Sequence, residues 1–95
     1  MILEAIERIR QMEQCFDMLQ DVENTNPKAF LEDASVKEEM QILLQYYEGG
    51  QWLRDYELDE AGLLPHNLKR GVLSEDAVYN FLTRIENFVH KENGA

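Results

Sequence analysis

The sequence predicts an all-α fold, a small helical bundle of three main helices plus a short helix and a connector. Three observations support this prediction. Apolar residues recur at spacings of three and four in the longer segments, no segment alternates apolar and polar residues as a half-buried strand would, and glycine and proline separate the segments. The chain of 95 residues suits one hydrophobic core, so we expect residues 1–95 to form a single helical domain.

The first predicted helix runs from Ile2 to about Glu23. Its apolar residues form a heptad-like stripe on one face, namely Ile2, Ala5, Ile9, Met12, Phe16 and Leu19. The Asn-Thr-Asn-Pro segment at 24–27 ends this helix, because proline disrupts a helix interior but suits the first turn of a new helix, with Asn26 as its N-cap. The stripe also leaves open a homodimer that forms through this helix.

A second helical region follows and ends near Glu48. Its apolar residues are Phe30, Ala34, Met40, Leu43, Leu44 and Tyr47. Residues 35–38, Ser-Val-Lys-Glu, form a capping-box pattern, so the helix either runs through from Pro27 or restarts at Val36 after a separate short turn over 27–34. Gly49-Gly50 ends the region, because glycine closes a helix in the left-handed conformation at little cost.

Two further helices complete the prediction. A short helix spans 51–61 and ends at Gly62, and a connector then runs over 63–71. The last helix has Ser74 as its N-cap, two acids in its first turn, and an end near Lys91. Its apolar stripe consists of Val78, Phe81, Leu82, Ile85, Phe88 and Val89.

The charge balance excludes several classes of partner. The chain carries 19 acidic and 9 basic residues, which gives a formal net charge of −10, and acids outnumber bases in both halves. Nucleic acids and anionic lipids are held chiefly by Lys and Arg, so we expect neither as a partner. An unknown protein partner is the expectation that remains.

Cysteine content and hydropathy bear on the compartment. Cys15 is the only cysteine, so the chain can form no internal disulfide and no structural thiolate zinc site. No uncharged stretch approaches the length needed to span a bilayer, and the acid at Glu4 interrupts the N-terminal apolar residues that a signal peptide would need. We therefore expect a cytoplasmic protein.

The segment 46–62 concentrates the residues with functional potential. It holds the only tryptophan, three of the four tyrosines and five acids. Such rings can form a groove for a partner, because they combine a large contact area with a polar tip. We expect Trp52 and Tyr47 to fill the end of the bundle, and Tyr46 and Tyr56 to be surface contacts.

The acids of this segment raise the possibility of a metal site. Asp55 and Asp59 would share a helix face, and together with Glu60 they form the basis of an alternative hypothesis, a metal-assisted hydrolase. A calcium loop beginning at Asp55 is excluded, because its sixth position is Glu60 rather than Gly and its twelfth is His66 rather than Glu. We expect no cofactor, and neither histidine lies in a catalytic motif.

Two cations ahead of Gly71 suggest a structural role for the same acids. Lys69 and Arg70 follow the acidic helix closely enough to fold back on it, so that Arg70 pairs with Asp55 or Asp59 and fixes the connector. The rival hypothesis is that both cations stay exposed and bind the acids of a partner.

Several motifs together resemble a small bacterial domain-of-unknown-function family. They are the Tyr46–Gly62 segment, Leu64-Pro65, the Leu-Lys-Arg-Gly-Val-Leu-Ser-Glu-Asp run at 68–76, Val78-Tyr79 and, near the N-terminus, Arg8-Ile9, Met12-Glu13 and Phe16-Asp17. The resemblance implies a bacterial, all-helical, stand-alone domain, and the family carries no established activity.

The sequence favours a protein-binding or adaptor module over an enzyme. The expected binding surface is built from residues 46–76. Its candidate binding residues are Tyr46, Trp52, Asp55, Tyr56, Asp59, Glu60, Lys69 and Arg70.

Overall fold

The computed structural model describes residues 2–93, which form helices without a strand and so confirm the all-α prediction. The elements in chain order are α1 (Ile2–Thr25), α2 (Ala29–Glu32), α3 (Ala34–Glu48), α4 (Gln51–Glu60), the 3-10 turn η1 (Gly71–Leu73) and α5 (Ala77–Asn93). The molecule is elongated, with principal extents of 46 × 20 × 18 Å. Within the described range, no helix is both long and apolar enough to cross a membrane.

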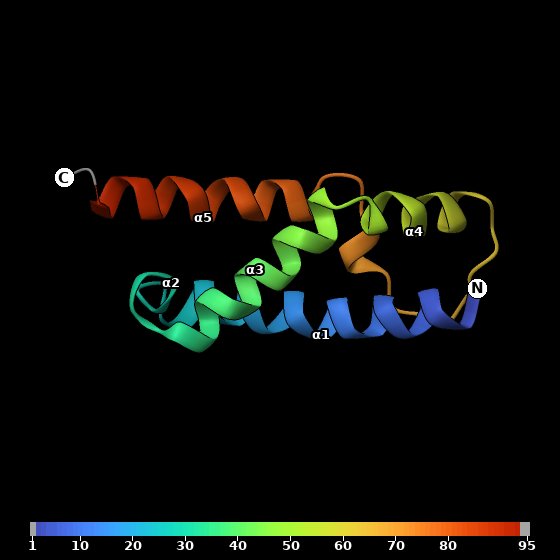
Figure 1. The fold of residues 1–95 in the computed structure, drawn as a ribbon, viewed down its shortest axis with the longest axis horizontal. Helices are drawn as coiled ribbons and strands as arrows, with labels where there is room; N and C mark the ends of the chain where they lie inside the picture. The colour runs from blue at the N-terminus through green and yellow to red at the C-terminus, as the bar shows by residue number, and fades with distance from the viewer. Residues whose placement is uncertain (1, 94–95) are drawn as a thin grey trace.

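The helices lie in two rows joined by a diagonal helix (Figure 1). In this view α1 forms the lower row, while α5 and α4 lie end to end in the upper row. The helix α3 crosses between the rows, and α2 lies at the end where α1 finishes. The connector returns from the far end of α4 past the start of α1, and η1 then lies between the rows and contacts α1, α4 and α5.

The core is formed by the apolar stripe of α1 together with residues from α2, α3, the connector, η1 and α5, and α4 packs the partly buried Trp52 and Leu58 against it. Its buried members are Ile9, Met12, Cys15, Phe16, Leu19, Ala29, Phe30, Val36, Leu43, Tyr46, Leu64, Leu68, Val72, Leu73, Val78, Phe81 and Ile85. Phe81 packs edge-on against Phe16, with ring centroids 5.5 Å apart, and against Phe30 at 6.2 Å. The stripe of α1 is buried from Ala5 to Leu19, whereas Ile2 is 37 % exposed, so a homodimer through the buried part would require the fold to open.

The region after Pro27 splits as one of the two alternatives predicted. Residues 29–32 form a single turn, and a new helix begins at Ala34. Its N-cap is Asp33 rather than Ser35: Asp33 Oδ1 accepts the backbone N–H of Ser35 at 2.9 Å and of Val36 at 3.3 Å. The Ser35 hydroxyl donates to the same oxygen at 2.8 Å and is the main reason why the pKa of Asp33 lies below its usual value.

Two other predicted caps are misplaced. Asn26 does not directly precede a helix: its backbone carbonyl accepts the N–H of Ala29 at 3.0 Å, and α2 begins at Ala29. The last helix begins at Ala77 rather than directly after Ser74, because η1 occupies the preceding residues and the Ser74 N–H closes that turn on the carbonyl of Gly71. The glycine boundary after α3 is confirmed, since Gly50 adopts φ +97°.

Candidate functional site

The centre of the candidate site is the carboxylate of Asp55, which is 0 % exposed and lies between α1, α3 and α4. Arg8 of α1 binds it with two hydrogen bonds: Nε–H donates to Oδ2 at 2.9 Å, and Nη2–H donates to Oδ1 at 2.5 Å. The hydroxyl of Tyr46 in α3 donates to Oδ2 at 2.7 Å. One buried carboxylate therefore ties three helices together.

Asp55 influences the charge states of its two hydrogen-bond partners. An isolated buried carboxylate would be costly, but the two-point contact with a guanidinium supplies charge-assisted hydrogen bonds that offset the loss of water. The hydrogen bond to Asp55 raises the pKa of Arg8. Burial, and then the hydrogen bond to Asp55, raises the pKa of Tyr46. Arg8 therefore stays charged and Tyr46 stays a hydrogen-bond donor near neutral pH.

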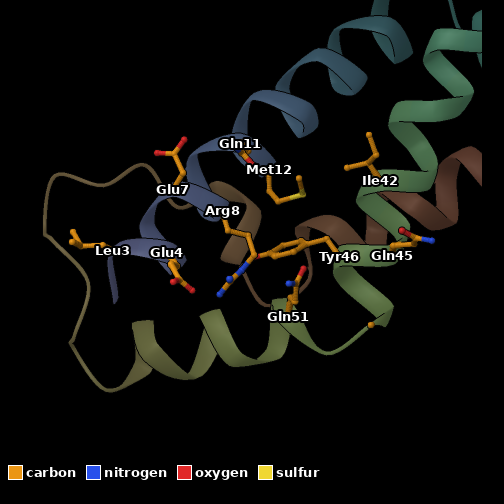
Figure 2. A pocket seen from close by; sticks show the side chains of 11 residues that line it. Leu3, Glu4, Glu7, Arg8, Gln11, Met12, Ile42, Gln45, Tyr46 and Gln51 are labelled. Atoms are coloured by element: carbon orange, nitrogen blue, oxygen red, sulfur yellow. The ribbon is translucent and has the colours of Figure 1, made fainter. Parts of the chain in front are cut away.

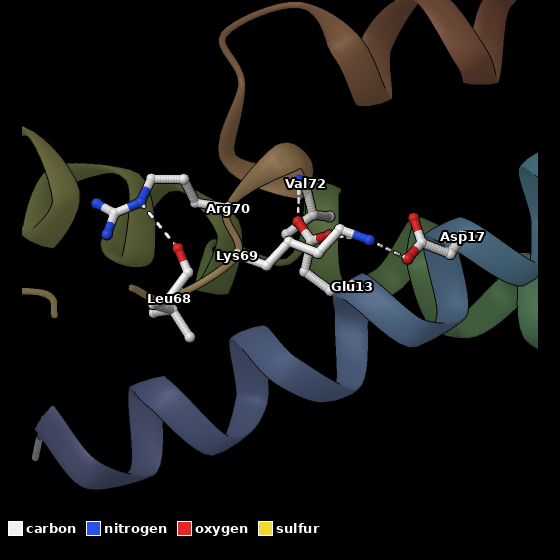
Figure 3. A network of polar contacts seen from close by, with 6 residues as sticks. All are labelled: Glu13, Asp17, Leu68, Lys69, Arg70 and Val72. Atoms are coloured by element: carbon white, nitrogen blue, oxygen red, sulfur yellow. Dashed lines mark hydrogen bonds and ion pairs between the residues drawn. The ribbon is translucent and has the colours of Figure 1, made fainter. Parts of the chain in front are cut away.

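A second buried carboxylate, Glu13 of α1, fixes η1 (Figure 3). Glu13 is 5 % exposed; its Oε1 accepts the backbone N–H of Val72, and its Oε2 lies 3.8 Å from Lys69 Nζ. The indole Nε1–H of Trp52 donates to the carbonyl of Val72 at 2.8 Å, so both backbone polar groups of that residue are fixed. A Cβ at Gly71 would lie 3.4 Å from Glu13 Oε1, which is an ordinary van der Waals contact, so the carboxylate lies directly against the backbone of this glycine.

Arg70 folds back on α4 as predicted. Its Nη1 donates to Asp59, its Nη2 to the carbonyl of Pro65 and its Nε to the carbonyl of Leu68 at 3.2 Å; Figure 3 shows the last of these bonds. The pairing of Arg70 with Asp59 is therefore confirmed, and it fixes the connector to α4.

Lys69 and Asp55 have other partners than the sequence suggested. Lys69 turns away from α4 and binds Asp17 of α1 (Figure 3), and this hydrogen bond raises the pKa of Lys69. Asp55, the second partner considered for Arg70, is bound by Arg8 instead. The rival hypothesis has both cations exposed and bound to the acids of a partner. Each cation pairs with an acid of its own chain, and Arg70 is only 33 % exposed, whereas Lys69 is 67 % exposed; binding of either cation to a partner stays a prediction.

The aromatic residues form a stack at the start of α4. The ring centroid of Trp52 lies 5.1 Å from that of Tyr47, in an edge contact, and 5.1 Å from that of Tyr56, in a stacked contact. Trp52 and Tyr47 are half-buried against the core, as expected. The expectation that Tyr46 is a surface contact is wrong: it is 3 % exposed, because α3 turns Leu43 and Tyr46 inward together.

The acids of α4 do not form one site. Asp55 is buried beneath Arg8, Asp59 pairs with Arg70, and Glu60 is exposed. Across residues 2–93, no three His, Cys, Asp or Glu side chains are placed to hold a metal ion. These three carboxylates, on which the hydrolase hypothesis depends, therefore lie in separate surroundings.

A groove of about 720 Å³ lies between the first half of α1 and the second half of α3, and the start of α4 closes one side (Figure 2). We call it the α1–α3 groove. Arg8 and Tyr46 lie at its centre, with Leu3 and Ile42 on opposite sides of them. The complete lining is Leu3, Glu4, Glu7, Arg8, Gln11, Met12, Ile42, Gln45, Tyr46, Gly49 and Gln51.

Arg8 and Glu13 are the central residues that the sequence prediction missed. The spacing of both residues from the apolar residues of α1 could have identified them. Arg8 lies three residues after Ala5 and four before Met12, and Glu13 lies four after Ile9 and three before Phe16, so each charge falls on the apolar face of the helix. A charged residue on a buried face needs a buried partner, which is a reason to search for opposite charges elsewhere in the chain.

Comparison with curated proteins and with solved structures found no match. A family model, described as domain of unknown function DUF4298, matches residues 9–92. The matched range includes Glu13, Tyr46, Asp55 and the whole connector, and it covers nearly the entire chain. The chain therefore belongs to the DUF4298 family.

Proposed function

We propose that this chain is a protein-binding module whose α1–α3 groove receives a helical segment of its partner. The observation that carries this proposal is the pair of exposed apolar side chains in the groove. Leu3 is 76 % exposed and Ile42 is 39 % exposed, on different helices that flank one hollow. Apolar side chains gathered around a concave surface are typical of sites that receive an apolar ligand or an amphipathic helix.

The fixed floor of the groove supports this proposal. Arg8 and Tyr46 are both held by Asp55, so the central side chains of the groove already have one defined position. A site that is ordered before binding loses less conformational entropy when its ligand arrives. The groove volume of about 720 Å³ also lies within the usual range for ligand sites.

The α1–α3 groove includes only part of the binding surface that the sequence predicts at residues 46–76. Tyr46 and Gln51 line it, but Asp59, Lys69 and Arg70 are engaged in pairs within the chain. A direct role in binding for Trp52, Asp55, Tyr56, Asp59, Glu60, Lys69 or Arg70 stays a prediction. We place the partner on the face that α1 and α3 build together.

The test uses a photo-crosslinking amino acid in place of Gln45, which lines the groove. In a lysate of the source cells, we expect one discrete crosslinked product that disappears when Leu3→Asp and Ile42→Asp are combined. The matched control is Leu53→Asp with Leu63→Asp, which adds the same charge at exposed leucines outside the groove lining. A product that both double variants remove equally, or that neither removes, would contradict the groove as the binding surface.

A further inference from the structure

We infer that the segment bound by the α1–α3 groove is a basic amphipathic helix, with an apolar face toward the groove and Lys or Arg along its border. This inference rests on the proposed function and adds the chemistry of the partner. Two acids, Glu4 and Glu7, line the groove from α1, and both are exposed. Among residues 2–93, neither acid forms an ion pair.

Arg8 attracts Glu4 electrostatically, but its direct partner is Asp55. Arg8 lines the same groove, but its guanidinium makes two hydrogen bonds to the fully buried Asp55 directly behind it. The charges of this pair cancel, so the groove presents the remaining two negative charges of Glu4 and Glu7. A partner that brings cations to this border would form ion pairs there, whereas an acidic partner would meet repulsion.

The other lining residues agree with an amphipathic occupant. Leu3, Met12 and Ile42 supply apolar surface for one face of a helix. The amides of three glutamines, Gln11, Gln45 and Gln51, can both donate and accept hydrogen bonds at the border. Apolar anchors spaced three and four residues apart on a partner helix would enter such a groove while its polar residues stay at the edge.

The net charge of the chain favours the same partner over longer distances. At −10, the molecule attracts cationic segments before contact, and this attraction raises the association rate at low salt. Long-range attraction alone would not distinguish the groove from the rest of the surface. The test therefore has to separate the charge in the groove from the charge of the whole molecule.

The experiment measures fluorescence anisotropy of two synthetic peptides of ~14 residues, or about 21 Å of helix. One peptide combines leucine on one face with lysine on the other, and the second replaces each lysine by glutamate. We expect the wild-type chain to bind the lysine peptide at least about tenfold more tightly than the glutamate peptide. Equal binding of the two peptides would overturn the inference.

Two matched variants then locate the charge effect. Glu4→Gln with Glu7→Gln should weaken binding of the lysine peptide about fivefold, whereas Glu38→Gln with Glu92→Gln should weaken it less than about twofold. Both double variants remove two exposed acids, so the net charge is the same, and Glu38 and Glu92 lie outside the groove lining. Equal weakening by both variants would show attraction to the whole molecule and would contradict the inference.

The outcomes also separate this inference from the proposed function. A groove-dependent crosslink at Gln45 together with equal binding of both peptides would refute the basic partner and leave the binding module. The absence of a groove-dependent crosslink, with neither peptide bound, would refute both. Thermal unfolding of each variant confirms that the change in binding is not a loss of folded protein.

Discussion

At one end of the molecule, the ring of Phe81 in α5 packs against those of Phe16 in α1 and Phe30 in α2, without a buried charge among them. At the other end, α1, α3, α4 and the connector enclose the two buried carboxylates, Asp55 and Glu13, each with its own partners. Within the described range, every buried side-chain nitrogen or oxygen has a hydrogen-bond partner. The burial of polar groups at this second end is therefore compensated by hydrogen bonds.

The difference between the two ends concerns specificity. Apolar contacts are non-directional, so the aromatic end can tolerate side chains of similar volume. A buried carboxylate accepts only partners at the correct distance and angle, so the polar end defines one arrangement of α1, α3 and α4. We interpret the aromatic end as the main source of stability and the polar end as the element that shapes the α1–α3 groove.

The largest expected effect is at the aromatic end. Phe81→Ala should lower the free energy of unfolding by about 3–5 kcal/mol, because Phe81 is fully buried and its removal leaves a cavity beside two other rings. Urea unfolding followed by circular dichroism measures this change. Phe81→Leu, which keeps most of the volume, should cost clearly less; an equal loss for both variants would contradict a simple packing role.

The second prediction concerns the polar end. Asp55→Ala should lower the free energy of unfolding by about 2–4 kcal/mol, because it leaves Arg8 and Tyr46 without their common acceptor. Combining Asp55→Leu with Arg8→Met and Tyr46→Phe should recover much of this loss, since an apolar set needs no hydrogen bonds. If the hydrogen bonds around Asp55 shape the α1–α3 groove, this triple variant should regain stability and still lose the groove-dependent crosslink at position 45.

A smaller effect is expected where charges lie at the surface. Arg70→Ala removes three hydrogen bonds that join the connector to itself and to α4, and should lower the melting temperature by about 4–8 °C, which corresponds to about 1 kcal/mol. Lys69→Ala removes a pair with Asp17 in which both side chains are at least half exposed, and should change stability by less than about 0.5 kcal/mol. Equal effects would contradict this ranking.

The last prediction concerns an effect on stability that is expected only at alkaline pH. Burial raises the pKa of the Cys15 thiol from its ordinary value of 9.0 to about 12, so the folded state keeps its proton at pH values where the unfolded chain has lost it. Stability should therefore be intact below pH 9 and should fall as the pH rises from about 9 toward 12. Cys15→Ala should show a shallower fall in chemical denaturation between pH 8 and 10.5. Parallel curves for the two proteins would contradict this assignment.

Local patterns in the sequence were sufficient to predict most of the fold. The stripes of α1 and α5 depend on residues three or four apart, and the glycines after α3 act on their own backbone. The same approach paired Arg70 with Asp55 or Asp59, and one of these two alternatives, Asp59 at a sequence separation of eleven, is the partner found. These features could be predicted because each depends on close neighbours along the chain.

Contacts between distant residues could not be predicted in this way. Arg8 and Asp55 are 47 residues apart, and Glu13 and Val72 are 59 apart, so no local pattern pairs them. The segment 63–71 was predicted only as a connector, although it contributes two core side chains, Leu64 and Leu68, and leads into η1, which contributes Val72 and Leu73. The error at Tyr46 has a similar cause, since a rotation of α3 by one residue decides whether Tyr46 or Tyr47 lies inside.

The indole of Trp52 has a practical consequence for studying how this molecule folds and opens. It is the sole tryptophan, and its indole N–H donates a hydrogen bond to the carbonyl of Val72. The environment of the ring therefore depends on the position of η1. If the connector detaches, the emission of Trp52 should change without any added dye. A stopped-flow fluorimeter could then time the arrival of the connector separately from the formation of the helices, which far-ultraviolet signals follow.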